Sequence, residues 1–307
     1  MRTLAEAHED WQTTRSIVKP LTSASNNSHW RNHIGPALGT RDLESLTRAD
    51  IARFIGELAA TLNPRTVRNI TTTLAQILDH AVDAGAIQIN PSAGVRRPRS
   101  PRMRPDNVLS PAQVAQMAAL HGDGGNVTVA LAWTGLRWSE LVGLRVADFI
   151  VNPYPVIHVR RQAQRVPARG VVDSTPKSHA ARTVPVPSPT LDVFKRAISG
   201  KSPTDPIFTS PRGTLLHPSN WRRQVHWPET LAAMHLVGFR PHDLRHTAAS
   251  YWIACGADIK TVQAILGHAS GQMTLDVYGH LMDQGLTVAT QRINDWANSS
   301  VRREGLS

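Results

Sequence analysis

The sequence predicts a mostly helical protein of two domains, the second of which also carries a small antiparallel β-sheet. Three observations indicate this fold class. Apolar residues recur at spacings of three and four over much of the 307-residue chain, which is the periodicity of amphipathic helices. A basic, proline-rich stretch at 95–107 interrupts that pattern, and short β-branched runs follow it. With 41% hydrophobic residues, the chain is able to bury a sizeable core.

The first domain, residues 1–94, is predicted to be a small helical bundle. Thr47 and Asp50 have the spacing of a capping box at a helix start. Asn63 and Pro64 are typical of the N-cap and first position of the next helix. That helix presents one apolar face, which consists of Val67, Ile70, Leu74, Ile77 and Ala81, before Gly85 ends it. An earlier helix is expected over 22–34, with Trp30 on its inner side.

Residues 95–107 are predicted to form an extended basic linker between the domains. Proline removes amide donors and disfavours helix, so the proline-rich composition argues against regular structure. Arginines in such a linker are suited to follow a phosphate backbone, although a solvated tether has the same composition. The linker arginines are Arg96, Arg97, Arg99, Arg102 and Arg104.

The second domain, residues 108–307, is predicted to be α-rich with one small sheet. Ser110, Pro111 and Gln113 indicate a capped helix start. The other elements are expected, in chain order, as a helix at 126–134, a helix after Arg137, strands at 156–160 and 183–186 with a polar segment between them, and helices from about 218 onwards.

The charge balance restricts the class of partner. The formal net charge is +11 and the isoelectric point about 10.9, which favours a polyanion such as nucleic acid over a merely soluble basic protein. The single cysteine, Cys255, excludes a disulfide framework within one chain and is expected to pack in the core. The first residues are polar and no apolar run is long enough for a membrane span, so we expect a cytoplasmic protein with no membrane partner.

Arg137 is the first candidate site residue. It follows Thr134 and Gly135, which break an apolar helix, and it leads into the next helix, where backbone amides favour a phosphate. Glu140 lies one helical turn further on and is placed to orient the guanidinium. An exposed Arg–Glu pair of little consequence has the same spacing.

His242 and Arg245 form a second group, because a spacing of three places them on one face of a helix. His246 is four residues after His242, which is one spacing found in zinc sites. The segment lacks the glutamate of that zinc motif and signals no third ligand, so we expect no metal site here.

His268 follows Leu266 and Gly267, a typical helix end, and Tyr278 lies ten residues further on. Either residue alone is compatible with ordinary packing. Taken together and in this order, the candidate residues resemble the motif of the tyrosine recombinase (phage integrase) family. The set consists of Arg137, His242-x-x-Arg245, Leu-Gly-His268 and Tyr278, and the resemblance is densest from 243 to 281. The resemblance leans towards integrases of phages or mobile elements of high-GC bacteria.

The resemblance implies a catalytic lysine in the turn of the small sheet. Lys177 fits as the only lysine between Ile51 and Phe194, with Arg182 as the fallback candidate. Preorganised cations stabilise the charge on a phosphorus transition state, which suits Arg137 and Arg245 as clamps on the non-bridging oxygens. The remaining implied roles are nucleophile for Tyr278, base for His242, hydrogen-bond donor for His268, general acid for Lys177, and support for Glu140 and His246.

The family's reaction passes through a 3′-phosphotyrosine bond and a Holliday junction and implies no metal or other cofactor. The implied partners are double-stranded DNA attachment sites, three further copies of the chain on synapsed DNA, and a possible directionality factor. Because the predicted helical domain begins almost at Met1, we expect no separate arm-binding domain and short attachment sites. Integration or excision of a mobile element is the leading interpretation. The alternatives are a Xer-type dimer resolvase, a DNA relaxing enzyme with the same chemistry, and a DNA-binding protein without catalysis.

Overall fold

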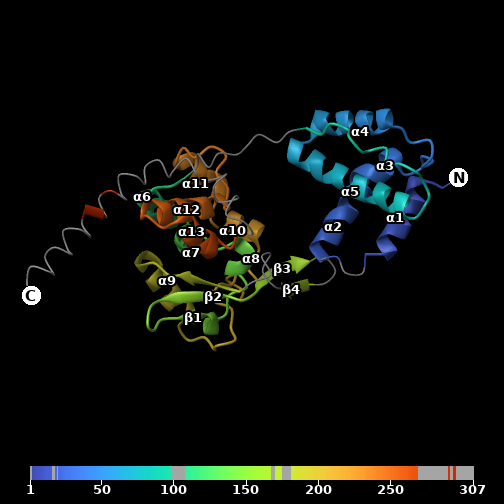
Figure 1. Cartoon of the computed structure of the whole chain (residues 1–307). Coiled ribbons are helices and arrows are strands. Elements are labelled where there is room, and N and C mark those ends of the chain that lie inside the picture. The colour runs from blue at the N-terminus through green and yellow to red at the C-terminus, as the bar shows by residue number, and fades with distance from the viewer. Residues whose placement is uncertain are drawn as a thin grey trace, which may run out of the picture. The chain divides into compact units, whose positions relative to one another are not determined.

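A computed structural model of the chain (Figure 1) describes residues 2–15, 18, 20–98, 108–166, 170–174, 181–268, 290 and 293–294. The chain divides into two compact units, Met1–Arg102 and Met103–Ser307. Each unit has a large hydrophobic core of its own. Residues 99–107 of the predicted linker lie outside the described residues, and with them Arg99, Arg102 and Arg104.

The first unit is a helical bundle arranged around one long helix, α5. This helix contacts α1, α2, α4 and η1, and its predicted apolar face is buried, as expected. The helices of the unit, in chain order, are α1 (Leu4–Thr13), α2 (Pro20–His29), the π-helical turn η1 (Trp30–Ile34), α3 (Gly35–Leu38), α4 (Arg48–Thr61) and α5 (Pro64–Asp83).

Side-chain caps fix the starts of α4 and α5. The Asp50 N–H donates to the Thr47 hydroxyl at 3.2 Å, and the Thr47 N–H donates to the Asp50 carboxylate at 3.1 Å. The Asn63 side chain accepts from the Thr66 N–H at 2.9 Å. These bonds satisfy amides that have no partner within the helix, so both predicted helix starts are confirmed.

Two parts of the first unit differ from the sequence prediction. Helix α1, which a reciprocal cap between Thr3 and Glu6 initiates, was not predicted. The helix expected over 22–34 begins at Pro20 and passes through the π-helical turn at Trp30 into α3. The half-buried Trp30 ring stacks on His8 with ring centroids 3.8 Å apart, which is why it lies on the inner side.

The second unit is built on α7, a helix buried on nearly all sides, as befits its apolar composition. It contacts α6, α9 and α12. The predicted cap of Ser110 and Gln113 at the start of α6 is confirmed. The helices of this unit are α6 (Pro111–Leu120), η2 (Gly122–Gly124), α7 (Gly125–Thr134), α8 (Trp138–Leu141), η3 (Val146–Asp148), α9 (Ser188–Ile198), α10 (Pro218–Gln224), α11 (Trp227–Ala233), α12 (Asp243–Ala254) and α13 (Ile259–Leu266).

The described strands of the second unit form two small antiparallel sheets. The first has the order β1-β2-β5, with Ile157 opposite Val184, and so confirms both predicted strands. The second is the hairpin β3-β4, in the segment predicted only as a polar separator. The strands are β1 (Phe149–Ile150), β2 (Val156–Val159), β3 (Gln162–Val166), β4 (Gly170–Ser174) and β5 (Arg182–Pro185).

Two further observations correct the sequence prediction in this unit. Helix α9 buries Thr190, Val193 and Phe194, whereas no helix was predicted between the second strand and residue 218. Cys255 is exposed, not packed in the core, because it lies just beyond the last residue of α12.

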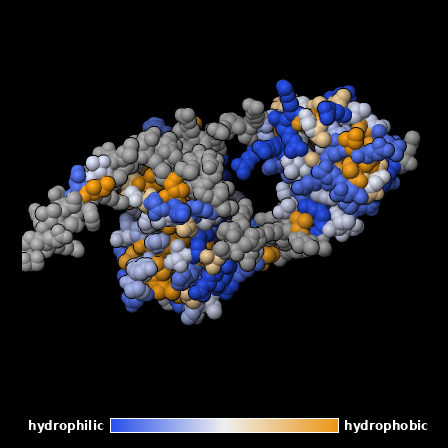
Figure 2. Space-filling model, viewed as in Figure 1, coloured by the Kyte–Doolittle hydropathy of each residue, from blue (hydrophilic) through white to orange (hydrophobic). Residues whose placement is uncertain are grey.

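Hydrophilic residues cover most of the described surface on the face shown in Figure 2, and apolar residues reach it in scattered places. The exposed apolar side chains include Ile89, Tyr154 and Val237, and such scattered exposure is normal for a folded protein. Among the described residues, no helix has both the length and the apolar character that crossing a membrane requires.

The core of the second unit encloses a histidine, His121. Its ring lies 5.6 Å from the Trp221 ring and 5.5 Å from the Trp227 ring, measured between centroids, and its Nδ1 is 2.7 Å from the Thr128 hydroxyl. Burial lowers the pKa of His121 from 6.5 to about 4. The ring is therefore neutral at neutral pH, and its protonation favours the unfolded chain.

We expect the stability that His121 contributes to be complete above about pH 6.5 and to fall as the pH decreases towards 4. The slope is at most about 1.4 kcal/mol per pH unit, because the unfolded chain binds one proton more. His121→Asn removes the titration and retains a donor near Thr128. Urea unfolding at several pH values should therefore give a shallower decline for the variant, and parallel declines would contradict the assignment.

Candidate active site

A glycine turn places Arg137 at the start of α8. Gly135 caps α7 in the left-handed conformation, with φ at 68°. A Cβ on Gly135 would lie 2.7 Å from the Leu266 side chain, so both the backbone conformation and the packing require glycine. The sequence analysis predicts that the backbone amides at the start of this helix also bind a phosphate. Helix α8 is a single turn, however, and the Arg137 N–H already donates to Glu140 at 2.8 Å.

Glu140 is the fully buried centre of an ion cluster, not one half of a surface pair. Arg137 Nη1 donates to one carboxylate oxygen at 2.8 Å. Arg182 donates to both oxygens, from Nη1 at 2.8 Å and from Nη2 at 2.7 Å. Burial alone would raise the pKa of Glu140, but the hydrogen bonds and charge of Arg182, followed by those of Arg137, outweigh it and lower the pKa to about 2.

Arg245 lies in the first turn of α12 and is buried, with 3% of its surface exposed. Its Nη1 donates to the Gly135 carbonyl at 2.6 Å and its Nη2 to the Leu266 carbonyl at 2.5 Å. These bonds fix the plane of the guanidinium, and both acceptors are neutral main-chain carbonyls.

Three arginines thus converge on the end of α13. Arg182 Nε donates to the Ile265 carbonyl at 2.8 Å, Arg245 to that of Leu266, and Arg137 Nη2 to that of Gly267 at 2.9 Å. Carbonyls at a helix C-terminus lack partners within the helix, so they are available acceptors. Among the described residues, Glu140 is the carboxylate that ion pairs join to Arg137 and Arg182.

Three of the predicted histidines lie close to these arginines. The His242 and His246 rings are 5.4 Å apart and nearly perpendicular. Burial, then repulsion from His246 and Arg245, lowers the pKa of His242 to about 4. Burial, then repulsion from Arg245 and Arg137, lowers the pKa of His268 to about 3. Both rings are therefore neutral at neutral pH, and each offers one N–H donor and one basic nitrogen.

The other predicted site residues are described only in part. Lys177, in the sequence between β4 and β5, and Tyr278 lie outside the described residues. Of the linker arginines, Arg96 is exposed, and Arg97 donates to the Thr72 hydroxyl at 3.3 Å. Among the described residues, no three histidine, cysteine or acidic side chains are grouped as metal ligands.

Sequence reasoning missed the role of Arg182, which entered only as the fallback for the lysine. Its guanidinium donates to the Glu140 carboxylate and to the Ile265 carbonyl, so its donors are directed at acceptors within the fold. One signal was present in the sequence. Glu140 lies in an apolar stretch, and a carboxylate buried there needs cations or hydrogen-bond donors as partners.

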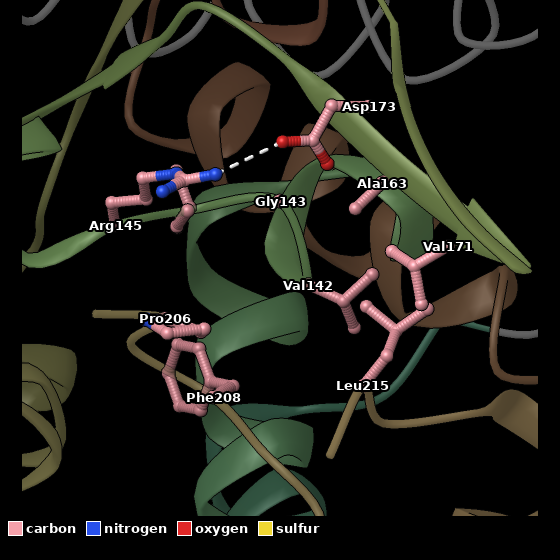
Figure 3. Close-up of a pocket in the computed structure, with 10 residues that line it drawn as sticks. Val142, Gly143, Arg145, Ala163, Val171, Asp173, Pro206, Phe208 and Leu215 are labelled. Atoms are coloured by element: carbon pink, nitrogen blue, oxygen red, sulfur yellow. Dashed lines mark hydrogen bonds and ion pairs between the residues drawn. The ribbon is translucent and has the colours of Figure 1, made fainter. Parts of the chain in front are cut away.

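A separate hollow of about 270 Å³ lies beneath the β3-β4 hairpin (Figure 3). Apolar side chains such as Val142, Phe208 and Leu215 line it, and an ion pair of Arg145 with Asp173, 3.0 Å long, borders it. None of the predicted site residues is among its lining residues, so the arginine cluster and this hollow are distinct.

Two family models match the chain, the phage integrase family over residues 109–284 and the phage integrase central domain over residues 4–98. The tyrosine recombinase XerC of Shewanella amazonensis is 28% identical over 280 residues, which cover 87% of this chain and 86% of the relative. The integrase of Mycobacterium phage D29 is 26% identical over 280 residues, which cover 89% and 73% respectively.

Solved structures show the same fold. The Tn1549 transposon integrase in complex with circular intermediate DNA superposes with a TM-score of 0.76 at 21% identity, over 90% of this chain and 95% of that one. A lambda integrase tetramer bound to a Holliday junction gives a TM-score of 0.65 at 17% identity, over 88% and 79%. Since the phage integrase family model matches more than half of the chain, the protein belongs to that family and is a tyrosine-type site-specific DNA recombinase.

Proposed function

We propose that this recombinase cuts DNA with Tyr278 and rejoins it through a 3′-phosphotyrosine intermediate, as an integrase of a mobile element. The observation that carries the proposal is the cluster of Arg137, Arg245, His242 and His268 at the end of α13. Two fixed guanidinium groups and two neutral histidines are suited to bind a phosphodiester and to stabilise the charge that builds up on it during attack.

The arginines supply the electrostatic part of the mechanism. A guanidinium has five N–H donors in a rigid plane, so protein acceptors hold one edge while another faces a phosphate oxygen. Carbonyl contacts hold Arg137 and Arg245 in this way. Such preorganised donors need no reorganisation when the transition state forms.

The proposed proton transfers balance. The Tyr278 oxygen forms a bond to phosphorus while the bond to the 5′ oxygen breaks. His242 is neutral at neutral pH and accepts the tyrosine proton, and Lys177 donates a proton to the departing 5′ oxygen. The phosphotyrosine bond conserves the energy of the cut ester, so a 5′ hydroxyl of another strand restores the ester without ATP or a metal.

The comparisons support DNA and further copies of the chain as proposed partners. The Tn1549 transposon integrase was solved with DNA, and lambda integrase as a tetramer on a Holliday junction. We propose that four copies of this chain act on two attachment sites, with exchange direction set by a further factor, in the cytoplasm of a bacterial host. Residues 1–94 would hold one face of the duplex and residues 108–307 the other, with the arginines of 95–107 along the backbone.

The first test mixes the purified protein with DNA that flanks its own gene, in buffer containing EDTA. We expect a protein–DNA adduct that survives detergent and is attached at a 3′ phosphate, and Tyr278→Phe should abolish it while retaining DNA binding. An adduct that persists in the variant, or that requires a metal ion, would overturn the assignment. Tight binding by the wild type with no adduct would indicate a DNA-binding protein without catalysis.

A second arm of the experiment separates the rival recombinase functions. Two plasmids, each with one attachment site, are incubated with the protein, and joined products are scored. Joined products support an integrase, whereas loss of supercoils without joining would indicate a relaxing enzyme. Joining of two identical chromosomal sites, with no activity on element ends, would indicate a Xer-type resolvase.

A further inference from the structure

We propose that Arg182 is a positioning residue, which neutralises Glu140 so that Arg137 keeps its positive charge and orientation for the scissile phosphate. This inference rests on the proposed function and adds a positioning residue to the catalytic residues named there. It starts from the way in which one buried carboxylate is shared between two arginines.

Arg182 is held more completely than Arg137. Its side chain is 8% exposed, and that of Arg137 is 20% exposed. Three donors of Arg182 are directed at fixed acceptors, two at Glu140 and one at the Ile265 carbonyl. A Cβ on Gly267 would lie within 3.0 Å of the guanidinium, so the backbone of the helix end packs directly against it. Arg182 is therefore enclosed within the fold, whereas Arg137 retains a face towards solvent.

The bidentate contact with Arg182 fixes the plane of the Glu140 carboxylate. That plane in turn fixes Arg137, because one oxygen accepts from Arg137 Nη1 and the other from the Arg137 N–H, each at 2.8 Å. A change at Arg182 would therefore alter the direction in which the Arg137 guanidinium points. Misplacing a catalytic group by about 1 Å is enough to cost about a hundredfold in rate.

The charge balance leads to the same conclusion. Glu140 has a depressed pKa and remains ionised at neutral pH. With Arg182 present, two guanidinium groups face one carboxylate, and one positive charge remains. Without Arg182, Glu140 and Arg137 would form a closed pair of zero net charge, and Arg137 would be drawn towards the acid. Both effects weaken the stabilisation of a negatively charged phosphate.

The test measures single-turnover cleavage of two substrates by the full chain. One substrate has an ordinary scissile phosphate. In the other, a methyl group replaces one non-bridging oxygen, so that the group is neutral and depends less on a nearby cation. We expect Arg182→Gln to lower cleavage of the phosphate about a hundredfold, and the deficit to shrink to about threefold or less on the neutral substrate, as a role through the Arg137 charge requires.

Arg182→Lys serves as the conservative variant. It restores the charge but not the two-pronged contact, so it should recover part of the rate on the phosphate. The matched control is Arg161→Gln, which breaks another ion pair of the second unit, with the buried Asp148. Any deficit of this control should be equal on the two substrates.

The double variant Glu140→Gln with Arg182→Gln keeps the test decisive if Arg182→Gln folds poorly. It removes both charges, keeps an acceptor for Arg137, and should cleave the phosphate faster than an equal amount of folded Arg182→Gln protein, with the folded fraction measured by circular dichroism. Equal deficits of Arg182→Gln on both substrates, no deficit at all, or a double variant no faster than the single one would overturn the inference. If the wild type itself forms no adduct, the proposed function fails instead, so the two failures are distinguishable.

Discussion

Arg245→Ala is expected to lower the single-turnover rate of DNA cleavage about a thousandfold or more. Loss of one preorganised hydrogen-bond donor to a developing oxyanion typically costs about a hundredfold to a thousandfold. Arg245 would contribute a full charge as well as a donor, from a position with 3% exposure. The effect is measured as the rate at which the covalent protein–DNA adduct accumulates on a nicked substrate.

Arg245→Lys is the matched control for this prediction. An ammonium group supplies the charge but does not bridge the Gly135 and Leu266 carbonyls as a planar guanidinium does. We expect a rate between those of the wild type and the alanine variant. Circular dichroism and DNA affinity should show that both variants fold and bind. A cleavage rate of the alanine variant within about tenfold of wild type would remove Arg245 from the proposed mechanism.

Glu140→Ala is expected to lower the free energy of unfolding by about 3–5 kcal/mol, because removing one partner of a buried ion pair leaves a charge uncompensated. The stranded charge is Arg182, whose side chain is 8% exposed. Urea unfolding followed by circular dichroism measures the loss. Glu140→Gln keeps the shape and one acceptor and should lose less. A loss below about 1 kcal/mol for the alanine variant would contradict the structure of this ion cluster.

The same carboxylate predicts an acid-dependent component of stability. The pKa of Glu140 is lower in the folded protein, about 2, than the ordinary value of 4.5. Its contribution is therefore complete above about pH 4.5 and is lost as the pH falls towards 2. That component should be absent from Glu140→Gln, which distinguishes it from the histidine-dependent loss at higher pH.

Sequence-based prediction succeeded where a local chemical signal marks an element. The starts of α4, α5 and α6 each combine a capping side chain with a following apolar face, and all three were predicted. Gly267 ends α13 in the left-handed conformation, as its position after Leu266 indicated. These features depend on interactions within one turn of the chain, so the sequence alone contains them.

The elements that were missed lack such a signal or depend on distant contacts. Strands β3 and β4 pair with each other and carry exposed residues such as Val171, so their apolar alternation is weak. Helix α9 follows strand β5 closely, and Pro187 and Pro189 lie at its start. Two prolines so close together are also typical of a loop, so the pattern does not predict a helix. Helix α1 is different, because the sequence does contain a signal for it, the capping box of Thr3 and Glu6.

In the candidate site, too, local signals were predictable from the sequence and contacts between distant residues were not. The order of Arg137, His242, Arg245, His268 and Tyr278 was sufficient to indicate the family. The pairing of Arg182 with Glu140 joins residues that are 42 positions apart, and no local pattern predicts it. Only the packing of β5 against α13 shows which arginine the buried acid binds.

The acceptors at the end of α13 also determine how the site tolerates mutation. Three arginines bind consecutive main-chain carbonyls, those of Ile265, Leu266 and Gly267. A carbonyl is present whichever side chain a codon specifies, so no substitution at these positions deletes an acceptor. Random mutation can disturb this framework only by changing the path of the backbone. The position most exposed to that risk is Gly267, whose φ of 65° and close contact with Arg182 leave no room for a Cβ.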